Sequence, residues 1–438
     1  MENPRECALD VLIKVDKKEE LSHIAISNVL EKYQFSEKRD RAFFTRLVEG
    51  TLERQITIDY VAEFYKVLEF GESLSEESCN HLEEALLRMG IYQLLYMDQV
   101  PDSATCNEAV KLAKKRGFSR LSGFVNGVLR NISRKKETIS YPKKDKNFVT
   151  YLSVTYSIPE WIIKFFMKTY DDETVEKIIE SYLEDKKTTL CCLMSKGGKD
   201  VIRKELEEEN VTVEDGELIE NAVKISDYDF LYRLRAFREG KCYVQDESSM
   251  LCAKLAGAKE GQFVMDLCSA PGGKSLYTAD QMKGSGQVLS RDLTEYKTDL
   301  IEDNIERMGF TNMEAEVFDA TILDEEHIEA ADVVIADVPC SGLGIMGKKN
   351  DIKYHISEDG MKDLVKLQRE ILTNAVQYVK HGGTLIYSTC TINPEENEKN
   401  MQWIINNFDY EAVDITEELP KNLKIETAKD GYIQLLPG

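Results

Sequence analysis

The chain has 438 residues, of which 42% are hydrophobic and 31% charged, and its formal net charge is −23. No segment reaches the roughly 18 apolar residues that a membrane-spanning helix needs, and the first residues, MENPRECALD, lack the apolar core of a signal peptide. The ten cysteines include no Cys-x-x-Cys pair and the five histidines are scattered, which disfavours a disulfide framework and a metal site. We expect a cytoplasmic protein that binds neither membranes nor metals.

Residues 1–140 carry apolar side chains at helical spacing, and strand-like patterns are nearly absent from them. The segments HIAISNVLEKY, RAFFTRLVEGTLER and LEEALLRMGIYQLLYM repeat apolar residues every three or four positions. This is the period of an α-helix that buries one face. The pattern predicts an all-helical N-terminal domain.

A basic segment, residues 111–146, overlaps the end of this domain. It has twelve Lys and Arg residues against two acids, a net charge of +10, so the rest of the chain carries −33. A basic segment on an acidic body is typical of a nucleic-acid footprint, although a solvated helix face followed by a charged linker has the same composition. The candidate RNA-binding side chains are Lys111, Lys114, Lys115, Arg116, Arg120, Arg130 and Arg134.

Residues 145–240 mix helical and strand-like patterns. IPEWIIKFFMKTY and KDVIRKELEEEN have helical spacing, whereas TTLCCLM and NAVKISDYD are typical of strands. We interpret this part of the chain as a small α+β module that links two larger domains.

From residue 241 to residue 438, strand-like and helical segments alternate. This alternation predicts an α/β, Rossmann-like domain with a doubly wound parallel sheet. The expected strands are QFVMDLC, QVLSRD, MEAEVFD, ADVVIAD and GTLIYST, followed by YEAVDI and YIQLLP.

The first expected strand leads into a glycine-containing loop, DLCSAPGGKS, residues 266–275. Ligands of such sheets bind beyond the carboxyl ends of the strands. A phosphate-binding loop is excluded by the cysteine at position 268, and the Gly-x-Gly-x-x-Gly fingerprint is missing. A nucleoside cofactor without a pyrophosphate, such as S-adenosylmethionine, remains, beside the alternative of a plain turn. The loop residues are Cys268, Ser269, Ala270, Pro271, Gly272, Gly273 and Lys274.

An aspartate lies at the end of each of the first four expected strands: Asp266, Asp292, Asp319 and Asp337. An acid at the end of the second strand can accept hydrogen bonds from both ribose hydroxyls, and Asp319 is placed to meet an adenine amino group. A single acid in this position is an ordinary turn residue. Four at one edge of the sheet indicate a nucleoside site.

Two cysteines, Cys340 and Cys390, also follow expected strands. If a methyl donor binds nearby, a thiolate can act as a covalent catalyst. Its addition to carbon 6 of a cytosine makes carbon 5 nucleophilic, so that carbon 5 can accept the methyl group. The second thiol would then help to release the product. Cysteines are otherwise commonly small buried apolar residues. That is our interpretation of Cys7, Cys79, Cys106, Cys191, Cys192, Cys242 and Cys252.

Together these motifs resemble those of the RNA cytosine-5 methyltransferases. DLCSAPGGKS, DVPCSGLG and YSTCTINPEENE are similar to three motifs of that family, as are VQDESSML and NDIKY. RDRAFFTRLVEGTLER and GFVNGVLRNISR resemble the helical RNA-binding domain shared with the antitermination factor NusB. That domain marks the B-type branch of the family, so the resemblance covers nearly the whole chain.

The resemblance implies a substrate and a role for three side chains. Cys390 would be the nucleophile, Cys340 would assist release, and Asp337 would hold the amidine edge of the cytosine and contact the donor. The implied partner is 16S ribosomal RNA, with cytosine 967 in that RNA's standard numbering as the target. We expect the protein to act as a monomer.

The resemblance also implies a donor site. The loop 268–274 would cradle the methionine part of S-adenosylmethionine, Asp292 its ribose and Asp319 its adenine. Two segments depart from the family: TTLCCLMSK replaces an Arg-Val-Asn-like strand, and the chain stops at LLPG, where relatives add a final antiparallel strand. We therefore expect a gap between strands 383–390 and 432–437 and a lower stability than that of longer relatives.

Three functional hypotheses stay open. The first is an rRNA cytosine-5 methyltransferase. The second is a non-catalytic RNA-binding ribosome-assembly factor that keeps the donor fold, and the third is the same chemistry on tRNA. The presence of both thiols and Asp337 favours an enzyme, and the helical N-terminal domain favours ribosomal RNA. The turn DVPC disfavours an amino-directed methyltransferase, which would resemble Asp/Asn-Pro-Pro-aromatic at this point.

Overall fold

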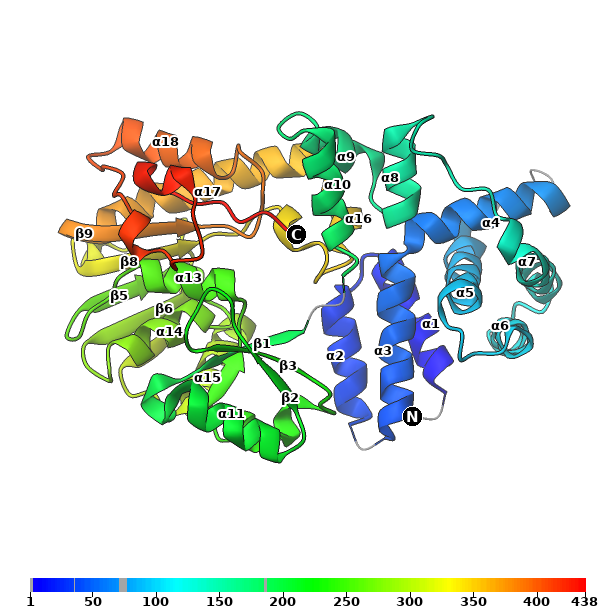
Figure 1. The fold of residues 1–438 in the computed structure, drawn as a ribbon, viewed down its shortest axis with the longest axis horizontal. Helices are drawn as coiled ribbons and strands as arrows, with labels where there is room; N and C mark the ends of the chain where they lie inside the picture. The colour runs from blue at the N-terminus through cyan, green and yellow to red at the C-terminus, as the bar shows by residue number, and fades with distance from the viewer. Residues whose placement is uncertain (1–2, 35, 71–76, 185–186) are drawn as a thin grey trace. The chain divides into compact units, whose positions relative to one another are not determined.

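The computed structural model describes residues 3–34, 36–70, 77–184 and 187–438. The side chain of Cys79, which we predicted to be buried, lies outside the described residues. The chain forms two compact units (Figure 1). The first comprises Met1–Glu184, Ile345–His355 and Pro437–Gly438, and the second comprises Asp185–Gly344 and Ile356–Leu436.

The first unit is built from helices, which confirms the prediction of a helical N-terminal region. Its first helix shows why the chain starts a helix there: the Asn3 side chain accepts hydrogen bonds from the N–H groups of Arg5 and Glu6, at 3.1 and 3.3 Å, and Pro4 occupies the first helical position. The helices are α1 Pro4–Asp16, α2 Ser22–Lys32, α3 Lys38–Glu53, α4 Gln55–Phe70, α5 Glu77–Tyr96, α6 Asp102–Lys115, α7 Leu121–Lys135, α8 Phe148–Tyr156, α9 Glu160–Phe166, α10 Asp172–Ser181 and α16 Ile352–His355.

Apolar residues at helical spacing form one core inside this unit. Leu9, Phe44, Leu47, Leu86 and Leu129 are fully buried and belong to a single cluster. They come from α1, α3, α5 and α7, so each of these helices turns one apolar face to the others. The helices α8 to α10 also belong to this unit, whereas the sequence pattern grouped residues 145–240 together.

The segment Ile345–His355 belongs to the first unit although it lies far along the chain. The Lys353 ammonium and the Tyr354 hydroxyl donate to the carbonyl oxygens of Glu53 (2.8 Å) and Leu52 (3.0 Å). These carbonyls lie in the last turn of α3, where a helix has no partners of its own for them. Asp351 accepts a hydrogen bond from the Ser22 N–H at 2.9 Å, at the first residue of α2.

The second unit begins with a four-stranded antiparallel sheet of order β2-β3-β1-β4. Its elements are β1 Thr188–Cys192, α11 Gly198–Glu208, β2 Thr212–Asp215, β3 Ala222–Ser226, α12 Arg235–Arg238 and β4 Cys242–Val244. Cys191, Cys192 and Cys242 are fully buried here, and Cys106 is buried in the first unit, as predicted. Cys7 and Cys252 are only partly buried.

The larger sheet of the second unit has five parallel strands in the order β7-β6-β5-β8-β9. This confirms the predicted doubly wound, Rossmann-like arrangement. The strands and their helices are α13 Glu247–Leu255, β5 Phe263–Asp266, α14 Gly273–Gln281, β6 Gln287–Asp292, α15 Glu295–Met308, β7 Met313–Val317, β8 Ala331–Asp337, α17 Glu358–Tyr378, β9 Val379–Ser388 and α18 Glu398–Asn407.

Both faces of this sheet are covered by helices, as the alternation within β8 shows. Val334 and Ala336 pack in one cluster with Leu372 of α17. Val333 and Ile335 pack in another with Met282, which follows α14. Successive side chains of a strand point to opposite faces, so the apolar run ADVVIAD has apolar partners on both sides.

The two strands predicted after β9 are not present. Residues 410–415 and 432–437 pair with no strand, so the expected gap between two strands, 383–390 and 432–437, does not form. In the second segment, apolar side chains pack without a backbone ladder. Ile433 and Leu435 lie against the cluster that contains Leu276 of α14.

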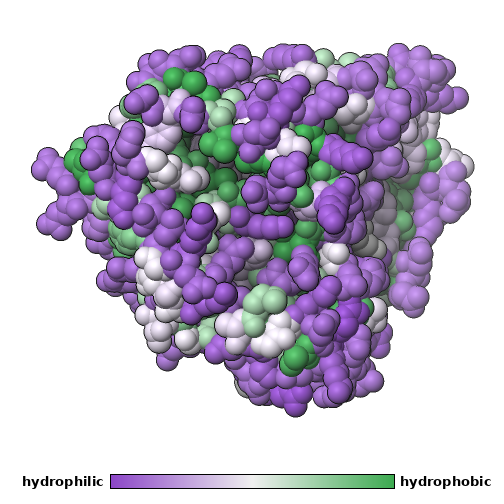
Figure 2. All heavy atoms as spheres, turned by 60° about the vertical axis from the view of Figure 1, so that its left-hand side comes forward, coloured by the Kyte–Doolittle hydropathy of each residue, from purple (hydrophilic) through white to green (hydrophobic). Residues whose placement is uncertain are grey.

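Among the described residues, no helix combines the length and the apolar character needed to cross a membrane. The same residues contain no cluster of three or more His, Cys, Asp or Glu side chains that could hold a metal ion. The face drawn in Figure 2 is mostly hydrophilic, with hydrophobic side chains in small patches.

Candidate active site

The candidate residues lie at the edge of the parallel sheet that is formed by the carboxyl ends of its strands. The chain builds β5, β6 and β7 outward in one direction and then returns to add β8 and β9 on the other side of β5. A ligand crevice forms at such a reversal, beyond the carboxyl ends of the two strands that flank it. Asp266 and Asp337 end those strands, β5 and β8.

The glycine-containing loop after β5 is held by hydrogen bonds between its two ends. The Ser275 hydroxyl donates to Asp266 Oδ2 at 2.7 Å and lies 2.9 Å from the Ser269 hydroxyl. Gly272, which precedes α14, has a φ of 100°, a left-handed conformation that glycine adopts without strain. The backbone therefore turns tightly in front of the free N–H groups of α14.

Asp266 is fully buried, and one of its oxygens has no partner. Oδ1 makes no hydrogen bond with any residue that the structure describes, whereas Oδ2 accepts from Ser275. Burial raises the pKa of Asp266 to about 6, because a carboxylate is costly to desolvate. The site thus contains an unused acceptor beside the loop.

Asp292 and Asp319 occupy the predicted positions beyond β6 and β7. Asp292 is buried and accepts hydrogen bonds from the N–H groups of Ala270 (3.0 Å) and Leu293 (2.8 Å) and from the Lys297 ammonium (2.8 Å). Asp319 accepts from the N–H and hydroxyl of Thr321, and these hydrogen bonds lower its pKa.

Lys274 and Asp337 form an ion pair between the loop and the end of β8, with 2.6 Å between Nζ and Oδ2. Burial lowers the pKa of Lys274, but the charge and hydrogen bond of Asp337, together with nearby Cys252 and Asp266, outweigh it, and the net pKa lies above the ordinary value. The Ser388 hydroxyl donates to the other oxygen of Asp337 at 2.6 Å. The Lys274 ammonium also donates to the Ser249 hydroxyl at 3.0 Å.

The two thiols that we singled out are in contact. The sulfur atoms of Cys340 and Cys390 are 2.9 Å apart, and the Cys390 N–H donates to the Cys340 sulfur at 3.1 Å. Cys390 is exposed, whereas Cys340 is partly buried. The hydrogen bond with Cys390, together with burial, raises the pKa of the Cys340 thiol well above its ordinary value.

Three residues of this edge were missed by the sequence analysis as site residues. Ser249 and Ser388 touch the Lys274–Asp337 pair, and both lie in the family-like motifs VQDESSML and YSTCTINPEENE. Leu293 follows Asp292 and is 57% exposed. An exposed apolar side chain next to the acid that we expect to meet the ribose suits the face of a nucleobase, and its signal was the apolar residue in SRDLT.

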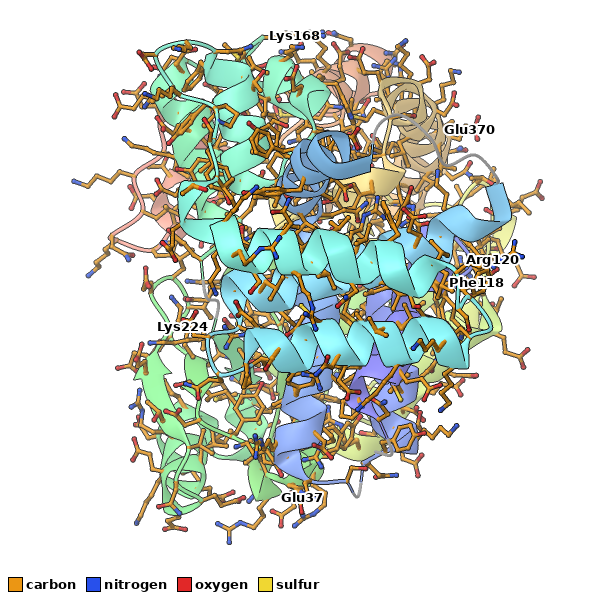
Figure 3. The ribbon with its side chains drawn as sticks, turned by 90° about the vertical axis from the view of Figure 1, so that its right-hand side faces the viewer. Glu37, Phe118, Arg120, Lys168, Lys224 and Glu370 are labelled. Carbon is orange, nitrogen blue, oxygen red and sulfur yellow. The ribbon has the colours of Figure 1, made fainter. Side chains whose placement is uncertain are left out.

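The candidate RNA-binding side chains lie on α6, on α7 and in the turn that joins them. Figure 3 shows these two helices side by side, with Phe118 and Arg120 labelled at the turn. Four side chains are already engaged: Lys111 with Glu108, Lys115 and Arg116 with Glu6, and Arg130 with Asn126. Within the part of the chain that the structure describes, Lys114, Arg120 and Arg134 form no ion pair.

Comparisons with known proteins agree with this architecture. Residues 253–438 match the family model for the 16S rRNA methyltransferase RsmB/F, and residues 2–134 match the model of the NusB family. The chain is 34% identical to a probable ribosomal RNA small subunit methyltransferase B of Bacillus subtilis (strain 168), over 99% of this chain and 95% of the relative.

Two solved structures show the same fold. The crystal structure of PH0851 superposes with a TM-score of 0.77 and 25% identity, covering 92% of this chain and 90% of that one. The structure of NSun6 from Pyrococcus horikoshii with SFG has a TM-score of 0.52 and 20% identity, covering 57% of this chain and 87% of that one.

Proposed function

The chain belongs to the ribosomal RNA small subunit methyltransferase B family, and we propose that it methylates carbon 5 of a cytosine in 16S ribosomal RNA with S-adenosylmethionine as donor. We infer cytosine 967 as the target from the family resemblance. The observation that carries the proposal is the 2.9 Å contact between the Cys340 and Cys390 sulfurs at the ligand edge of the sheet. In a covalent mechanism with a separate release step, one of two adjacent thiols can attack the base and the other can assist release.

The residues at the carboxyl ends of β5 to β7 fit a methyl donor. S-adenosylmethionine would supply an electrophilic methyl group on a sulfonium sulfur. The loop 268–274 would hold its methionine part, with the unused oxygen of Asp266 as an acceptor nearby. Asp292 would accept from the ribose hydroxyls, Asp319 would meet the adenine amino group, and Leu293 would lie against the base. The relative NSun6 was solved with SFG, an S-adenosylmethionine analogue.

Cys390 would act as the nucleophile, because it is the exposed thiol of the pair. Its thiolate adds to carbon 6 of the cytosine, and carbon 5 then takes the methyl group. The carbon-5 proton leaves to solvent, the bond between carbon 6 and sulfur breaks, and the electron pair returns to the Cys390 sulfur. The raised pKa of Cys340 keeps a proton on its sulfur, so Cys340 can assist release by donating a hydrogen bond to the departing thiolate.

Asp337 would orient the cytosine through its amidine edge. Each Asp337 oxygen already accepts one hydrogen bond, from Lys274 or Ser388, and a carboxylate oxygen has room for a second. The ion pair with Lys274 and the hydrogen bond from Ser388 hold the Asp337 carboxyl group in place for this role.

The surface formed by α6 and α7 would hold the phosphates of the RNA, with Lys114, Arg120 and Arg134 as the leading contacts because they form no ion pair with the described residues. Lys111, Lys115, Arg116 and Arg130 would contribute after exchange of their present partners. A 16S rRNA substrate would also imply a cytoplasmic location.

The proposal is tested by incubating the protein with S-adenosylmethionine and unmodified 16S RNA and mapping 5-methylcytosine by bisulfite sequencing. We expect one methylated position, cytosine 967, with the parent chain and none with Cys390→Ala. If the protein methylated tRNA but not 16S RNA, the proposed chemistry would stand and the proposed substrate would be wrong. RNA binding without methylation, from a chain that also fails to bind S-adenosylmethionine, would favour the assembly-factor hypothesis.

A further inference from the structure

Beneath the two thiols lies a network of buried polar side chains that the proposed chemistry does not use. Glu396, Asn400 and Gln368 are each fully buried. They come from the loop after Cys390, from α18 and from α17. Burying polar groups costs folding free energy unless every one of them is hydrogen-bonded. We therefore ask what these side chains do next to the thiols.

Glu396 and Gln368 hold the peptide groups on both sides of Cys340. Glu396 Oε2 accepts from the N–H of Ser341 at 2.9 Å and from Gln368 Nε2 at 2.8 Å. The same Gln368 nitrogen donates to the carbonyl oxygen of Pro339 at 2.9 Å. The residue before Cys340 and the residue after it are therefore tied to one carboxylate–amide pair.

The chemistry at position 396 requires a group that only accepts hydrogen bonds. Besides Ser341 and Gln368, the Asn393 side chain donates to Glu396 Oε1 at 2.8 Å. An ionised carboxylate matches three N–H donors, whereas a glutamine would turn its own NH2 group toward at least one of them. This explains why an acid, rather than its amide, is buried here.

The next residue, Asn397, holds both neighbours of Cys390. Its amide nitrogen donates to the Thr391 carbonyl oxygen at 2.9 Å, and its amide oxygen accepts from the Thr389 hydroxyl at 2.6 Å. Asn397 precedes α18, where an asparagine commonly caps the helix, yet its side chain makes no capping hydrogen bond. Its side chain is committed to the Cys390 loop instead.

The two loops are also joined directly. The hydroxyls of Ser341 and Thr391 are 2.7 Å apart, and the Gly344 N–H donates to the Cys390 carbonyl oxygen at 3.0 Å. A Cβ on Gly344 would lie 2.9 Å from that carbonyl oxygen, so no larger residue fits without moving Cys390.

We propose that Glu396 and Asn397 are positioning residues with separate tasks: Glu396 sets the place of Cys340 for release, and Asn397 sets the place of Cys390 for attack. The inference rests on the proposed cytosine chemistry. A misplacement of about 1 Å can cost a hundredfold in rate. Loss of the Glu396 hydrogen bonds should therefore slow release more than attack, and loss of the Asn397 hydrogen bonds should slow attack more than release. A merely structural role would lower both steps together.

The test compares adduct and product for matched variants, with S-adenosylmethionine and unmodified 16S RNA. In Glu396→Gln, release should slow about tenfold, so the fraction of protein covalently bound to RNA rises relative to methylated product. In Asn397→Ala combined with Cys340→Ala, the adduct should form about tenfold more slowly than in Cys340→Ala alone. Glu395→Gln and Asn407→Ala are the controls, because Glu395 and Asn407 bond only near the surface of α18.

A second measurement guards against variants that fold poorly. Alkylation of the native protein by iodoacetamide, followed by mass spectrometry, should show faster labelling of Cys340 in Glu396→Gln, with Cys252 labelling unchanged. If Cys340→Ala traps an adduct but Glu396→Gln keeps the parent's adduct-to-product ratio and Cys340 labelling, the inference is wrong and the proposed function stands. If neither the parent nor Cys340→Ala attacks the RNA, the proposed function fails and the inference falls with it.

Discussion

Lys353 is buried and Lys274 is largely so, but the two lysines have different partners and lie in different units. The Lys274 ammonium lies 2.6 Å from the Asp337 carboxylate, whereas that of Lys353 donates to the Glu53 carbonyl oxygen at 2.8 Å. Burial lowers the pKa of both. For Lys274 the charge and hydrogen bond of Asp337, together with nearby Cys252 and Asp266, reverse the effect, whereas the pKa of Lys353 falls to about 7.

The contrast shows that the partner, rather than the motif, decides what a buried lysine does. Both residues lie in segments that resemble family motifs, DLCSAPGGKS and NDIKY. A desolvated ammonium keeps its charge where a carboxylate faces it and is easily neutralised where only a neutral dipole does. Lys274 therefore brings a fixed charge to the ligand edge, and Lys353 serves mainly to join the segment 345–355 to the end of α3.

The largest effect should follow from breaking the pair at the ligand edge. Asp337→Asn leaves the Lys274 charge buried without a counter-ion, and we expect a loss of about 2–4 kcal/mol in the free energy of unfolding, measured by urea denaturation. The double variant with Lys274→Met should recover much of that stability but no methyl transfer. Asp363→Asn, in an ion pair that is 73% exposed on both sides, should change stability by less than about 0.5 kcal/mol.

Lys353 should give the first unit a pH-dependent stability. Its folded pKa of about 7 lies below the unfolded value of about 10.4, so the unfolded state binds more protons between these values and stability rises with pH. Relative to Lys353→Met, the parent should gain about 2 kcal/mol between pH 7 and 9. A pH-independent difference between the two unfolding curves would show that Lys353 is not desolvated.

Asp266 should produce the opposite slope. Its folded pKa of about 6 lies above the unfolded value of about 3.9, so the folded state binds more protons in this window and stability falls as pH rises. Relative to Asp266→Asn, the parent should lose about 2 kcal/mol between pH 4 and 6. Unfolding midpoints of both proteins across this range provide the check, and a rising difference would contradict the assignment.

The smallest effect concerns the basic surface. Replacing Lys114, Arg120 and Arg134 with glutamine should reduce the slope of log K against log salt concentration for RNA binding by about 2–3, because each phosphate contact contributes about 0.7–0.9. The same change at Lys111, Lys115 and Arg116, which face acids, should reduce the slope less. Equal reductions would mean that the ion pairs do not compete with RNA.

The sequence predicted that the aspartates of the ligand edge lie at strand ends, because strand ends are local features. Each run of apolar residues ended at an aspartate or just before a cysteine, and parallel strands bring such ends together. It did not predict the pairing of Lys274 with Asp337, or the grip of Glu396 on Cys340, because these contacts join residues that are 63 and more than 50 positions apart.

The C-terminal segments show where pattern reading fails. Residues 432–437 read YIQLLP, a short and mostly apolar run such as a strand can have, but Ile433 and Leu435 pack on helical residues without forming one. The composition of the basic segment was likewise incomplete evidence for an RNA-binding surface. Lys115 and Arg116 pair with Glu6 and Asp10, which come from α1. A count of charges along the chain does not include neighbours in space.

The central claim is that Cys390 bonds to the cytosine and Cys340 assists its release. The most direct test is to incubate Cys340→Ala with S-adenosylmethionine and unmodified 16S RNA and to separate the products on a denaturing gel. We expect a protein band covalently shifted by RNA, which disappears when Cys390→Ala is added. A shifted band that survives in the double variant, or free turnover by Cys340→Ala at the parent's rate, would contradict the assignment of the two thiols.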